Sequence, residues 1–506
     1  MTDAVLSRVK ERQPVPRVNR VLIVTLDGLR PDLVTEARMP HLVRLCESGV
    51  RLADYHAAYP THTRVQVCTL ATGSYPGAHG ITANLMVVPG VGPDHIVDTA
   101  DYQHLEAFDR ATGGRALLLP TLSELLAREG RRLAVAGSGS PGSTILWTRT
   151  HPYRVVNPRT AYGRPDLYAL RAKLGEPPEP TAPTLELVAY ALRAVTDLFL
   201  EDPEVAVIVL WLNEPDASLH RYGLGASEVS TVLSRLDQLV ARLLDGLAAR
   251  GLLDDTALIV LSDHGHSTPG SGRSLAELLA SSPAAVRQAA APLLPASDYL
   301  FLRPEAPRPS PVDLRPLVEW LYDQPWVGAV FARAADAVEL PGTLSLEALW
   351  GDRLDGETVG RVPVLSVNPA WSHEPNPYGI PGSVLALTEQ VALRSTHGAA
   401  SPYDLHAFAL FLGPGILAGE VSRVPAGAVD LVPTVLELLG IPIPEHVQGR
   451  VLREIFESAP PDMAEYRREL IYPPTPGGER DPVLVRERVG ATTYVHLVAP
   501  GADASR

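Results

Sequence analysis

The chain has few cysteines, no excess of positive charge and no long apolar segment. Its two cysteines, Cys46 and Cys68, both fall in helical patterns, so we expect two free thiols rather than a disulfide. No run reaches the roughly 18 apolar residues of a membrane span, and residues 1–20 lack the apolar stretch of a secretory signal. We therefore expect a cytoplasmic protein without membrane partners.

The charge balance argues against binding to nucleic acid polymers. Lys and Arg number 44 against 58 Asp and Glu, which gives a formal net charge of −14. The 506 residues are 45% hydrophobic and 20% charged, as in ordinary globular proteins with a large buried core. This length suits one large domain with a smaller cap, or two to three domains.

Three apolar runs each lead to an aspartate. They span residues 20–26, 205–212 and 257–262, and the aspartates are Asp27, Asp216 and Asp263. Continuous apolar runs of this length are typical of strands covered on both faces, hence of a parallel sheet. Helical patterns at 121–130, 183–202 and 227–251 alternate with these strands. The pattern predicts an α/β fold with a doubly wound, mostly parallel sheet and helices on both faces.

Composition divides the chain into three parts. Residues 18–290 and 391–458 carry the strand and helix patterns, and we expect them to form the α/β core. Residues 291–390 are rich in proline and glycine, which indicates an inserted cap. Residues 459–506 are poorly patterned, so we expect a C-terminal tail on the surface.

The aspartates come with histidines at metal-ligand spacing. Asp216 and His220 are four residues apart, as ligands on one helix face are, and Asp263 and His264 are adjacent just past a strand end. Ligands of parallel sheets gather at the carboxyl ends of the strands. Two divalent ions with three protein ligands each would fit, Zn²⁺ best, with Mn²⁺, Fe or Co²⁺ as alternatives. The full set is three carboxylates and three imidazoles: Asp27, Asp216, Asp263, His220, His264 and His397.

Each of these residues alone would more often be a helix cap, a turn residue or a hydrogen-bonded polar side chain. Their joint spacing favours the metal cluster. His62, His266 and His406 lie near the motifs but match no ligand position, and we interpret them as structural or supporting residues.

The motifs resemble those of the alkaline phosphatase superfamily, most closely its nucleotide pyrophosphatase/phosphodiesterase branch. The resemblance spans about residues 20–450 and implies an alkaline-phosphatase-like fold and a phosphoric ester hydrolase. It rests on Leu26-Asp27-Gly28, Tyr59-Pro60-Thr61-His62-Thr63, Gly73-Ser74-Tyr75-Pro76 with His79-Gly80-Ile81, Glu214-Pro215-Asp216 with His220, Asp263-His264-Gly265 and Thr396-His397-Gly398.

The resemblance also implies roles for single residues. Thr63 stands at the position of the nucleophile, which would form a phosphothreonine intermediate, and Asn84 matches an asparagine that binds a phosphate oxygen. One zinc would be held by Asp216, His220 and His397. The other would be held by Asp27, Asp263, His264 and the oxygen of Thr63. The implied activity is that of a phosphodiesterase on a small-molecule phosphate ester.

Arg64 departs from the family pattern, which typically has a base-stacking aromatic residue there. We expect Arg64 to bind an anionic part of the substrate; the alternative is an ion pair with a nearby carboxylate. A phosphomonoesterase or phosphonate hydrolase of the same superfamily is the main rival function, and a non-catalytic metal-binding relative is a weaker one. A sulfatase is disfavoured, because those enzymes generally derive their nucleophile from Cys or Ser rather than Thr. The oligomeric state stays open.

Overall fold

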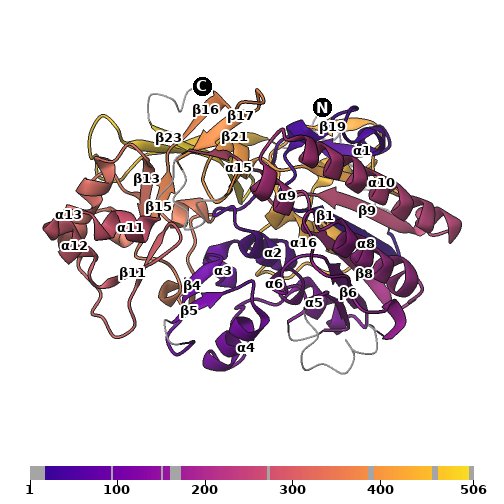
Figure 1. Ribbon diagram of the computed structural model, residues 1–506. Helices are drawn as coiled ribbons and strands as arrows, with labels where there is room; N and C mark the ends of the chain where they lie inside the picture. Colours follow the sequence, from indigo (N-terminus) through magenta and orange to yellow (C-terminus); the bar gives the residue numbers. More distant parts are fainter. Residues whose placement is uncertain are drawn as a thin grey trace, which may run out of the picture.

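A mixed eight-stranded sheet forms the centre of the molecule in the computed structural model (Figure 1). The structure describes residues 17–92, 95–149, 152–159, 172–270, 274–385, 393–458 and 465–500. The strand order is β19-β2-β18-β9-β1-β8-β6-β7, and β18 is the one strand of these eight that runs against the others. The strands are β19 (Glu420–Ser422), β2 (Val50–Leu52), β18 (Ala409–Leu412), β9 (Thr256–Leu261), β1 (Arg20–Leu26), β8 (Val205–Leu212), β6 (Arg132–Gly137) and β7 (Arg154–Val156).

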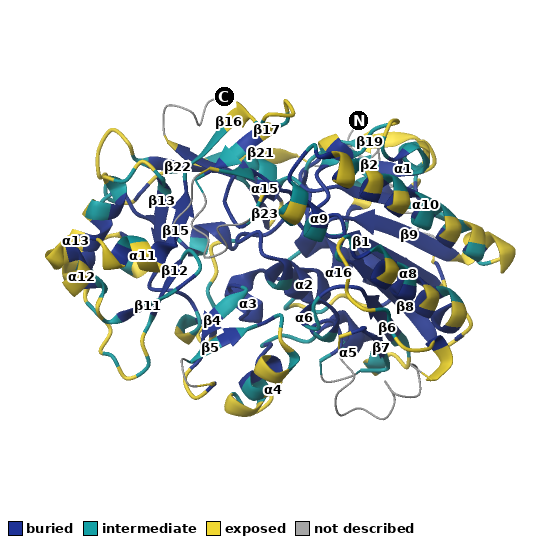
Figure 2. Cartoon of the chain, viewed as in Figure 1, coloured by how far each residue is buried: buried dark blue, intermediate teal, exposed yellow. Residues whose placement is uncertain are grey.

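Both faces of this sheet are covered, as the apolar runs predicted. In β1, Val21 and Ile23 belong to one hydrophobic core, whereas Leu22 and Val24 belong to the other, because successive side chains of a strand point to opposite faces. Figure 2 shows the strands as a buried layer beneath partly exposed helices. The predicted doubly wound α/β fold is confirmed.

Helices pack on each face of the sheet. One core contains α2 (Thr63–Thr72), α5 (Leu122–Arg128) and α16 (Leu431–Leu439). The other contains α1 (Pro40–Cys46), α8 (Leu185–Ala194) and α10 (Ser227–Ala249). α5 and α10 match the helices predicted at 121–130 and 227–251. The helix predicted at 183–202 is α8, which continues as a π-helical turn over Val195–Phe199. Cys46 and Cys68 are free, as expected.

The segment expected to be a cap has a sheet and a hydrophobic core of its own. Helices α11 (Leu275–Ala280), α12 (Ala284–Ala290) and α13 (Pro311–Tyr322) pack on it, so its core already begins before residue 291. The domain boundaries stay a prediction. The sheet has the order β11 (Leu293–Ala296), β12 (Tyr299–Leu302), β15 (Leu365–Pro369), β13 (Val327–Ala332) and β14 (Leu344–Ser345).

Residues 465–500 form a three-stranded antiparallel sheet, a structure that we did not predict for the C-terminal tail. It consists of β21 (Tyr466–Ile471), β22 (Pro482–Val489) and β23 (Thr492–Pro500). Leu484 and Val498 share a core with Phe331 of β13, so β22 and β23 are part of the packed body of the molecule. Residues 459–464 and 501–506 of the expected tail lie outside the described residues.

The expectation that the chain lacks a secretory signal rests on residues 1–20. Residues 1–16 of this segment lie outside the described residues. Among the helices that the structure describes, none combines the length and apolarity needed to cross a bilayer. Smaller paired strands are β3 (Tyr55–His56) with β20 (Ala426–Gly427), β4 (Leu85–Val87) with β5 (Ile96–Asp98), and β10 (Thr268–Pro269) with β17 (Pro381–Val384) and β16 (Trp371–Pro375).

The N-terminus of α1 is held by a carboxylate from α10. Asp237, which is 1% exposed, accepts hydrogen bonds from the backbone N–H groups of His41 at 3.0 Å and Leu42 at 2.8 Å. We expect Asp237→Ala to lower the free energy of unfolding by about 1–3 kcal/mol, because two first-turn donors lose their acceptor. Asp245→Ala, at an exposed position of the same helix, should change it by less than about 0.5 kcal/mol. Denaturant unfolding of both variants beside the wild type measures the difference; equal effects would contradict the role of Asp237.

Candidate metal centre

Three aspartates meet at the carboxyl ends of the adjacent strands β9, β1 and β8. Asp27 directly follows β1, Asp263 follows β9 after one residue, and Asp216 begins α9 (Asp216–Tyr222) shortly after β8. Backbone hydrogen bonds tie these strand ends together: Asp27 N donates to Leu212 O and Asp216 N donates to Asp27 O, both at 2.9 Å. The sheet topology therefore brings residues from distant parts of the sequence to one edge.

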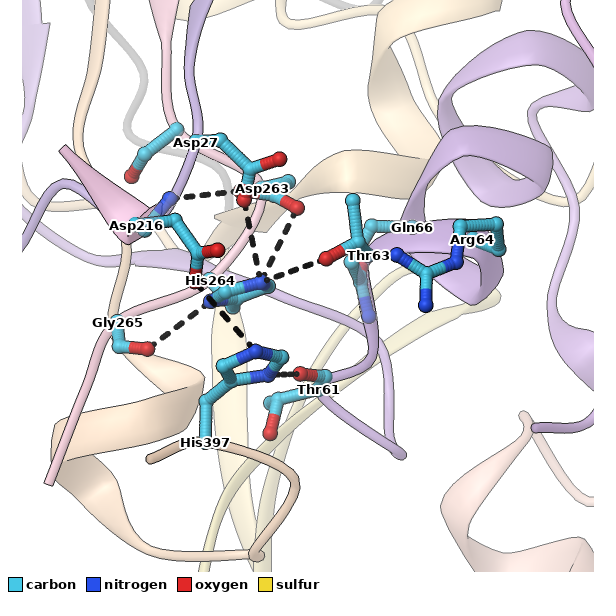
Figure 3. Close-up of polar contacts among 12 residues, drawn as sticks. Asp27, Thr61, Thr63, Arg64, Gln66, Asp216, Asp263, His264, Gly265 and His397 are labelled. Carbon is cyan, nitrogen blue, oxygen red and sulfur yellow. Dashed lines mark hydrogen bonds and ion pairs between the residues drawn. The ribbon is translucent and has the colours of Figure 1, made fainter. Parts of the chain in front are cut away.

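Three histidines lie against these carboxylates, and Figure 3 shows two of them, His264 and His397. His220 follows Asp216 by one helical turn, and its Nε2 is 3.2 Å from Asp216 Oδ1. His264 Nε2 is 3.3 Å from Asp263 Oδ2 and 3.5 Å from Asp27 Oδ1. His397 Nε2 is 3.5 Å from Asp216 Oδ1, and its ring stacks on that of His264 with the centroids 3.7 Å apart. All six residues predicted as ligands thus lie in one cluster.

Backbone carbonyls fix the orientation of all three rings. The Nδ1 atoms of His220, His264 and His397 lie 2.7, 3.0 and 2.6 Å from the carbonyl oxygens of Ser395, Gly265 and Thr61. A carbonyl only accepts, so each Nδ1 carries the proton. In the neutral ring, Nε2 then presents a lone pair to the carboxylates. This is the arrangement in which proteins hold metal-binding histidines.

Burial and the neighbouring charge of Asp216 together determine the protonation of these rings. Burial lowers the pKa values of His264 and His397 and so keeps them neutral near pH 7. Burial acts on His220 in the same sense, but the charge of Asp216 outweighs it and raises the pKa.

Two carboxylates have one oxygen held by the protein and one oxygen bare. Trp211 Nε1 donates to Asp27 Oδ2 at 2.9 Å, and Gly28 N donates to Asp263 Oδ1 at 3.0 Å. Asp27 Oδ1 and Asp263 Oδ2 are buried and accept no hydrogen bond from any described residue. Burial, together with the mutual charges of the carboxylates, raises the pKa values of Asp27 and Asp263. Bare anionic oxygens facing imidazole lone pairs fit divalent cations, which remove both repulsions.

His266 belongs to the same cluster, although we set it aside on sequence grounds. Its Nε2 lies 2.8 Å from Asp216 Oδ1, and its Nδ1 lies 2.9 Å from Ser395 Oγ. Burial lowers its pKa to about 4, so the ring is neutral. Four potential ligands, Asp216, His220, His266 and His397, therefore surround one point, and Asp27, Asp263 and His264 surround a second. The signal available in the sequence was the spacing of Asp263, His264 and His266.

The position of His266 also explains why residue 28 is a glycine. Gly28 has φ +74°, in the left-handed region, and a Cβ there would come within 2.6 Å of His266 Nε2. The backbone after β1 passes directly over the imidazole, so a side chain at position 28 would displace it.

Thr63 lies beside the second group, at the start of α2. It is 5% exposed, and its Oγ1 is 3.3 Å from His264 Nε2. Asn84 is tied to the same loop: its backbone N–H donates to His62 Nδ1, and its Oδ1 accepts from Arg64 N, both at 3.2 Å. The Nδ2 group of Asn84 donates to none of the described residues. Burial lowers the pKa of His62 to about 3, which leaves this ring a neutral acceptor with a supporting role.

Arg64 is next to Thr63 (Figure 3) and half-buried. No described carboxylate lies within ion-pair distance of its guanidinium, and its Nε is buried without a hydrogen-bond acceptor among the described residues. Burial lowers the pKa of Arg64, while the charges of Asp98, Asp27, Asp216 and Asp263 raise it. The ion pair considered from the sequence does not form within the described part of the chain.

Fold and site together place the chain in the alkaline phosphatase superfamily, whose members are generally metal-dependent. Within it, the chain belongs to the type I phosphodiesterase/nucleotide pyrophosphatase family, whose model matches residues 21–305. The sulfatase family model matches residues 226–441. The resemblance drawn from the motifs is confirmed.

Two curated relatives match about half of this chain. The bis(5′-adenosyl)-triphosphatase ENPP4 of Pongo abelii is 27% identical over 247 residues, which are 49% of this chain and 47% of the relative. The venom phosphodiesterase of Macrovipera lebetinus is 25% identical over 249 residues, which are 48% of this chain and 25% of the relative. The match thus spans about half of the first relative and about a quarter of the second.

Solved structures support the fold over most of the chain. The alkaline phosphatase PafA has a TM-score of 0.67 at 17% identity and covers 88% of this chain and 100% of its own. Murine ectonucleotide pyrophosphatase/phosphodiesterase 5 in complex with AMP has a TM-score of 0.59 at 17% identity, with 85% and 96% covered.

The hydrogen bond from Trp211 to Asp27 gives a test of the metal centre. We expect Trp211→Phe to weaken divalent metal binding by about 10- to 100-fold, because Asp27 loses the donor that orients it. Trp147→Phe is the matched control: Trp147 is buried beside Trp211, with ring centroids 6.4 Å apart, and its Nε1 has no hydrogen-bond partner among the described residues. Zn²⁺ titration of chelator-stripped protein measures both affinities. Equal losses in the two variants would mean that packing, not the hydrogen bond, determines the effect.

Proposed function

We propose that the chain is a two-metal phosphoric ester hydrolase, most specifically a phosphodiesterase, that acts on a small-molecule ester through a phosphothreonine at Thr63. The observation that carries the proposal is the position of the Thr63 hydroxyl, 3.3 Å from His264 Nε2 and beside the Asp27–Asp263–His264 group. Membership of the phosphodiesterase family and the activities for which the two curated relatives are named support it.

The donor sets suit two divalent ions, Zn²⁺ first, with Mn²⁺ or Fe as alternatives. Asp216, His220 and His397 would hold one ion, with His266 beside them; Asp27, Asp263, His264 and Thr63 would hold the other. When bound, such ions supply positive charge that lowers the pKa of a hydroxyl and stabilises a phosphoryl group during displacement.

The protein's own residues fix the reacting groups. Thr63 is immobilised by burial in the first turn of α2, so its Oγ1 is held ready to attack phosphorus. A bond from Thr63 Oγ1 to phosphorus forms as the bond to the leaving-group oxygen breaks. Water then attacks the phosphothreonine, releases phosphate or its monoester and restores the hydroxyl.

Asn84 and Arg64 are placed to bind the phosphoryl oxygens. The hydrogen bond from Arg64 N to Asn84 Oδ1 orients the carboxamide, which leaves its N–H₂ group free to donate to a non-bridging oxygen. The Arg64 guanidinium, without a carboxylate partner in the described part of the chain, can donate to a further anionic oxygen.

Substitution of Thr63 tests the proposed mechanism. We expect Thr63→Ala to lower kcat on an aryl phosphodiester by about 10³-fold or more at full metal content, because the nucleophile is lost. Thr63→Ser retains a primary hydroxyl and should keep measurable turnover. Acid-quenched wild-type enzyme should carry the phosphoryl group, with its remaining ester substituent, on the peptide that contains Thr63. Exhaustive chelation should abolish turnover until Zn²⁺ or Mn²⁺ is restored. A Thr63→Ala variant with near-wild-type rates would rule out the intermediate.

Arg64 also favours a second candidate, a phosphomonoesterase, because a terminal phosphate has one more anionic oxygen to bind. For a phosphodiesterase, we expect an aryl diester to be cleaved with nucleotide diesters showing little advantage in kcat/KM. Arg64→Ala should reduce kcat/KM most for anionic substrates, and Arg64→Phe should raise the preference for nucleotides. A panel of diester, monoester, phosphonate and sulfate esters, assayed with all three proteins, separates the candidates. Strong nucleotide preference with indifference to Arg64→Ala would show that Arg64 only braces the loop.

A further inference from the structure

A second mixed cluster of carboxylates and imidazoles lies outside the proposed catalytic centre. Asp54 and His56 come from the segment around β3, Glu487 from β22 and His496 from β23. One potential ligand atom of each of these four residues lies within 4.8 Å of the other three. None of the four belongs to the motifs of the family resemblance.

A β-bulge in the C-terminal sheet brings together the two members of the cluster that this sheet contributes, Glu487 and His496. Val485 pairs with Leu497 and Arg486 pairs with Val495, so His496 has no register partner on β22. Bulges re-aim the side chain of the extra residue. The His496 ring meets the His56 ring edge-on, with the centroids 5.5 Å apart.

Hydrogen bonds join Asp54 to His56 and to Glu487, but they leave other polar atoms of the cluster unpaired. His56 Nε2 lies 2.6 Å from Asp54 Oδ1, which is an ordinary imidazole–carboxylate pair. Glu487 is 8% exposed. Its Oε2, together with His56 Nδ1 and His496 Nδ1, is buried without a hydrogen-bond partner among the described residues. Arg468, opposite Glu487 on β21, is exposed and forms no ion pair with it. A network of the four side chains alone leaves these three polar atoms unexplained.

The electrostatics point the same way. Burial and the neighbouring charge of Asp54 raise the pKa of Glu487 to about 7, as expected for two carboxylates forced together. Burial and the neighbouring His56 lower the pKa of His496 to about 4, so this ring is neutral and one of its nitrogens has a lone pair. The charge of Asp54 outweighs burial and raises the pKa of His56, so this ring offsets part of the repulsion between the carboxylates. A divalent cation would offset it for both Asp54 and Glu487.

We propose that Asp54, His56, Glu487 and His496 bind a third divalent cation, of the Zn²⁺ class, that ties the C-terminal sheet to β3. Two imidazoles and two carboxylates suit tetrahedral Zn²⁺, whose ligand atoms lie about 3.4 Å apart at bond lengths of about 2.1 Å. The four ligand atoms lie within 4.8 Å of one another, so binding requires a contraction of at most about 1.4 Å. Asp54 is partly exposed, with 25% of its side chain accessible, which gives the ion a route of entry.

This tie would brace the loop that carries the proposed nucleophile. β3 ends at His56, only seven residues before Thr63. β3 also pairs in parallel with β20. Tyr494 of β23 stacks beside His56, so the sheet and the loop are already in contact. A cation here would hold the C-terminal sheet against the start of that loop.

Metal counting tests the site independently of catalysis. The test uses three forms of the full chain. They are the wild type, a double variant, Asp216→Ala/Asp263→Ala, in which both proposed catalytic metal groups are disrupted, and the double variant with His496→Ala added. After chelation, reloading with Zn²⁺ and removal of free metal, we expect about three, one and zero ions per chain by elemental analysis. In the double variant, Co²⁺ should give the intense visible absorption of tetrahedral cobalt, and Zn²⁺ should raise the melting temperature; both responses should disappear with His496→Ala.

Two further variants guard the interpretation. Glu487→Gln keeps the shape of the side chain but removes its charge, and we expect it to lose the ion. Circular dichroism of each variant shows whether the fold is retained, which separates loss of the ligand from misfolding. His41→Ala removes a histidine on α1 outside every cluster and should change nothing. The proposal is overturned if the double variant binds no zinc. It is also overturned if the double variant keeps its zinc when either His496→Ala or Glu487→Gln is added. A zinc that persists in the double variant and is lost with His496→Ala supports it even if the proposed phosphodiesterase activity fails.

Discussion

The structure depends on how three carboxylates are accommodated at one buried sheet edge. Asp27, Asp216 and Asp263 meet there because β9, β1 and β8 are adjacent and parallel. Burying unpaired charges costs several kcal/mol for each ion, far more than one hydrogen bond returns. The donors from Trp211 and Gly28 satisfy one oxygen of Asp27 and one of Asp263. Divalent cations would satisfy the remaining oxygens of Asp27 and Asp263, which face the ring of His264, and burial keeps that ring neutral.

The ring orientations connect the metal centre to the loop of the proposed nucleophile. His397 is held by the carbonyl of Thr61, and the hydroxyl of Thr61 accepts from Gly398 N at 2.9 Å. His264 contacts the hydroxyl of Thr63. Any shift of residues 61–63 would therefore move ligands from two different chain segments. The site behaves as one unit in which nucleophile and ligands are positioned by the same hydrogen bonds.

Much of this arrangement was predictable from the sequence. Buried parallel strands read as continuous apolar runs, and the residues after such strands meet at one edge; this is why the aspartates, His220 and His264 could be found from local spacing. His266 was missed because it matched no ligand position of the family, although it lies only two residues after His264. The C-terminal sheet was missed because part of the core that β22 and β23 share, around Phe331 of β13, lies far away in the sequence. Contacts of that range leave no periodic signal in a single chain.

The same limit explains why the cluster of Asp54, His56, Glu487 and His496 has no signature in the sequence. More than 400 residues separate its two halves, and the bulge that turns His496 inward depends on strand pairing, not on any local pattern. What reveals the cluster is unbalanced chemistry: a buried carboxylate oxygen and an imidazole nitrogen without partners. The catalytic centre shows the same imbalance at Asp27 and Asp263. In both clusters, a buried carboxylate oxygen without a donor among the described residues lies beside imidazoles, and carboxylate with imidazole is a donor set that suits divalent cations.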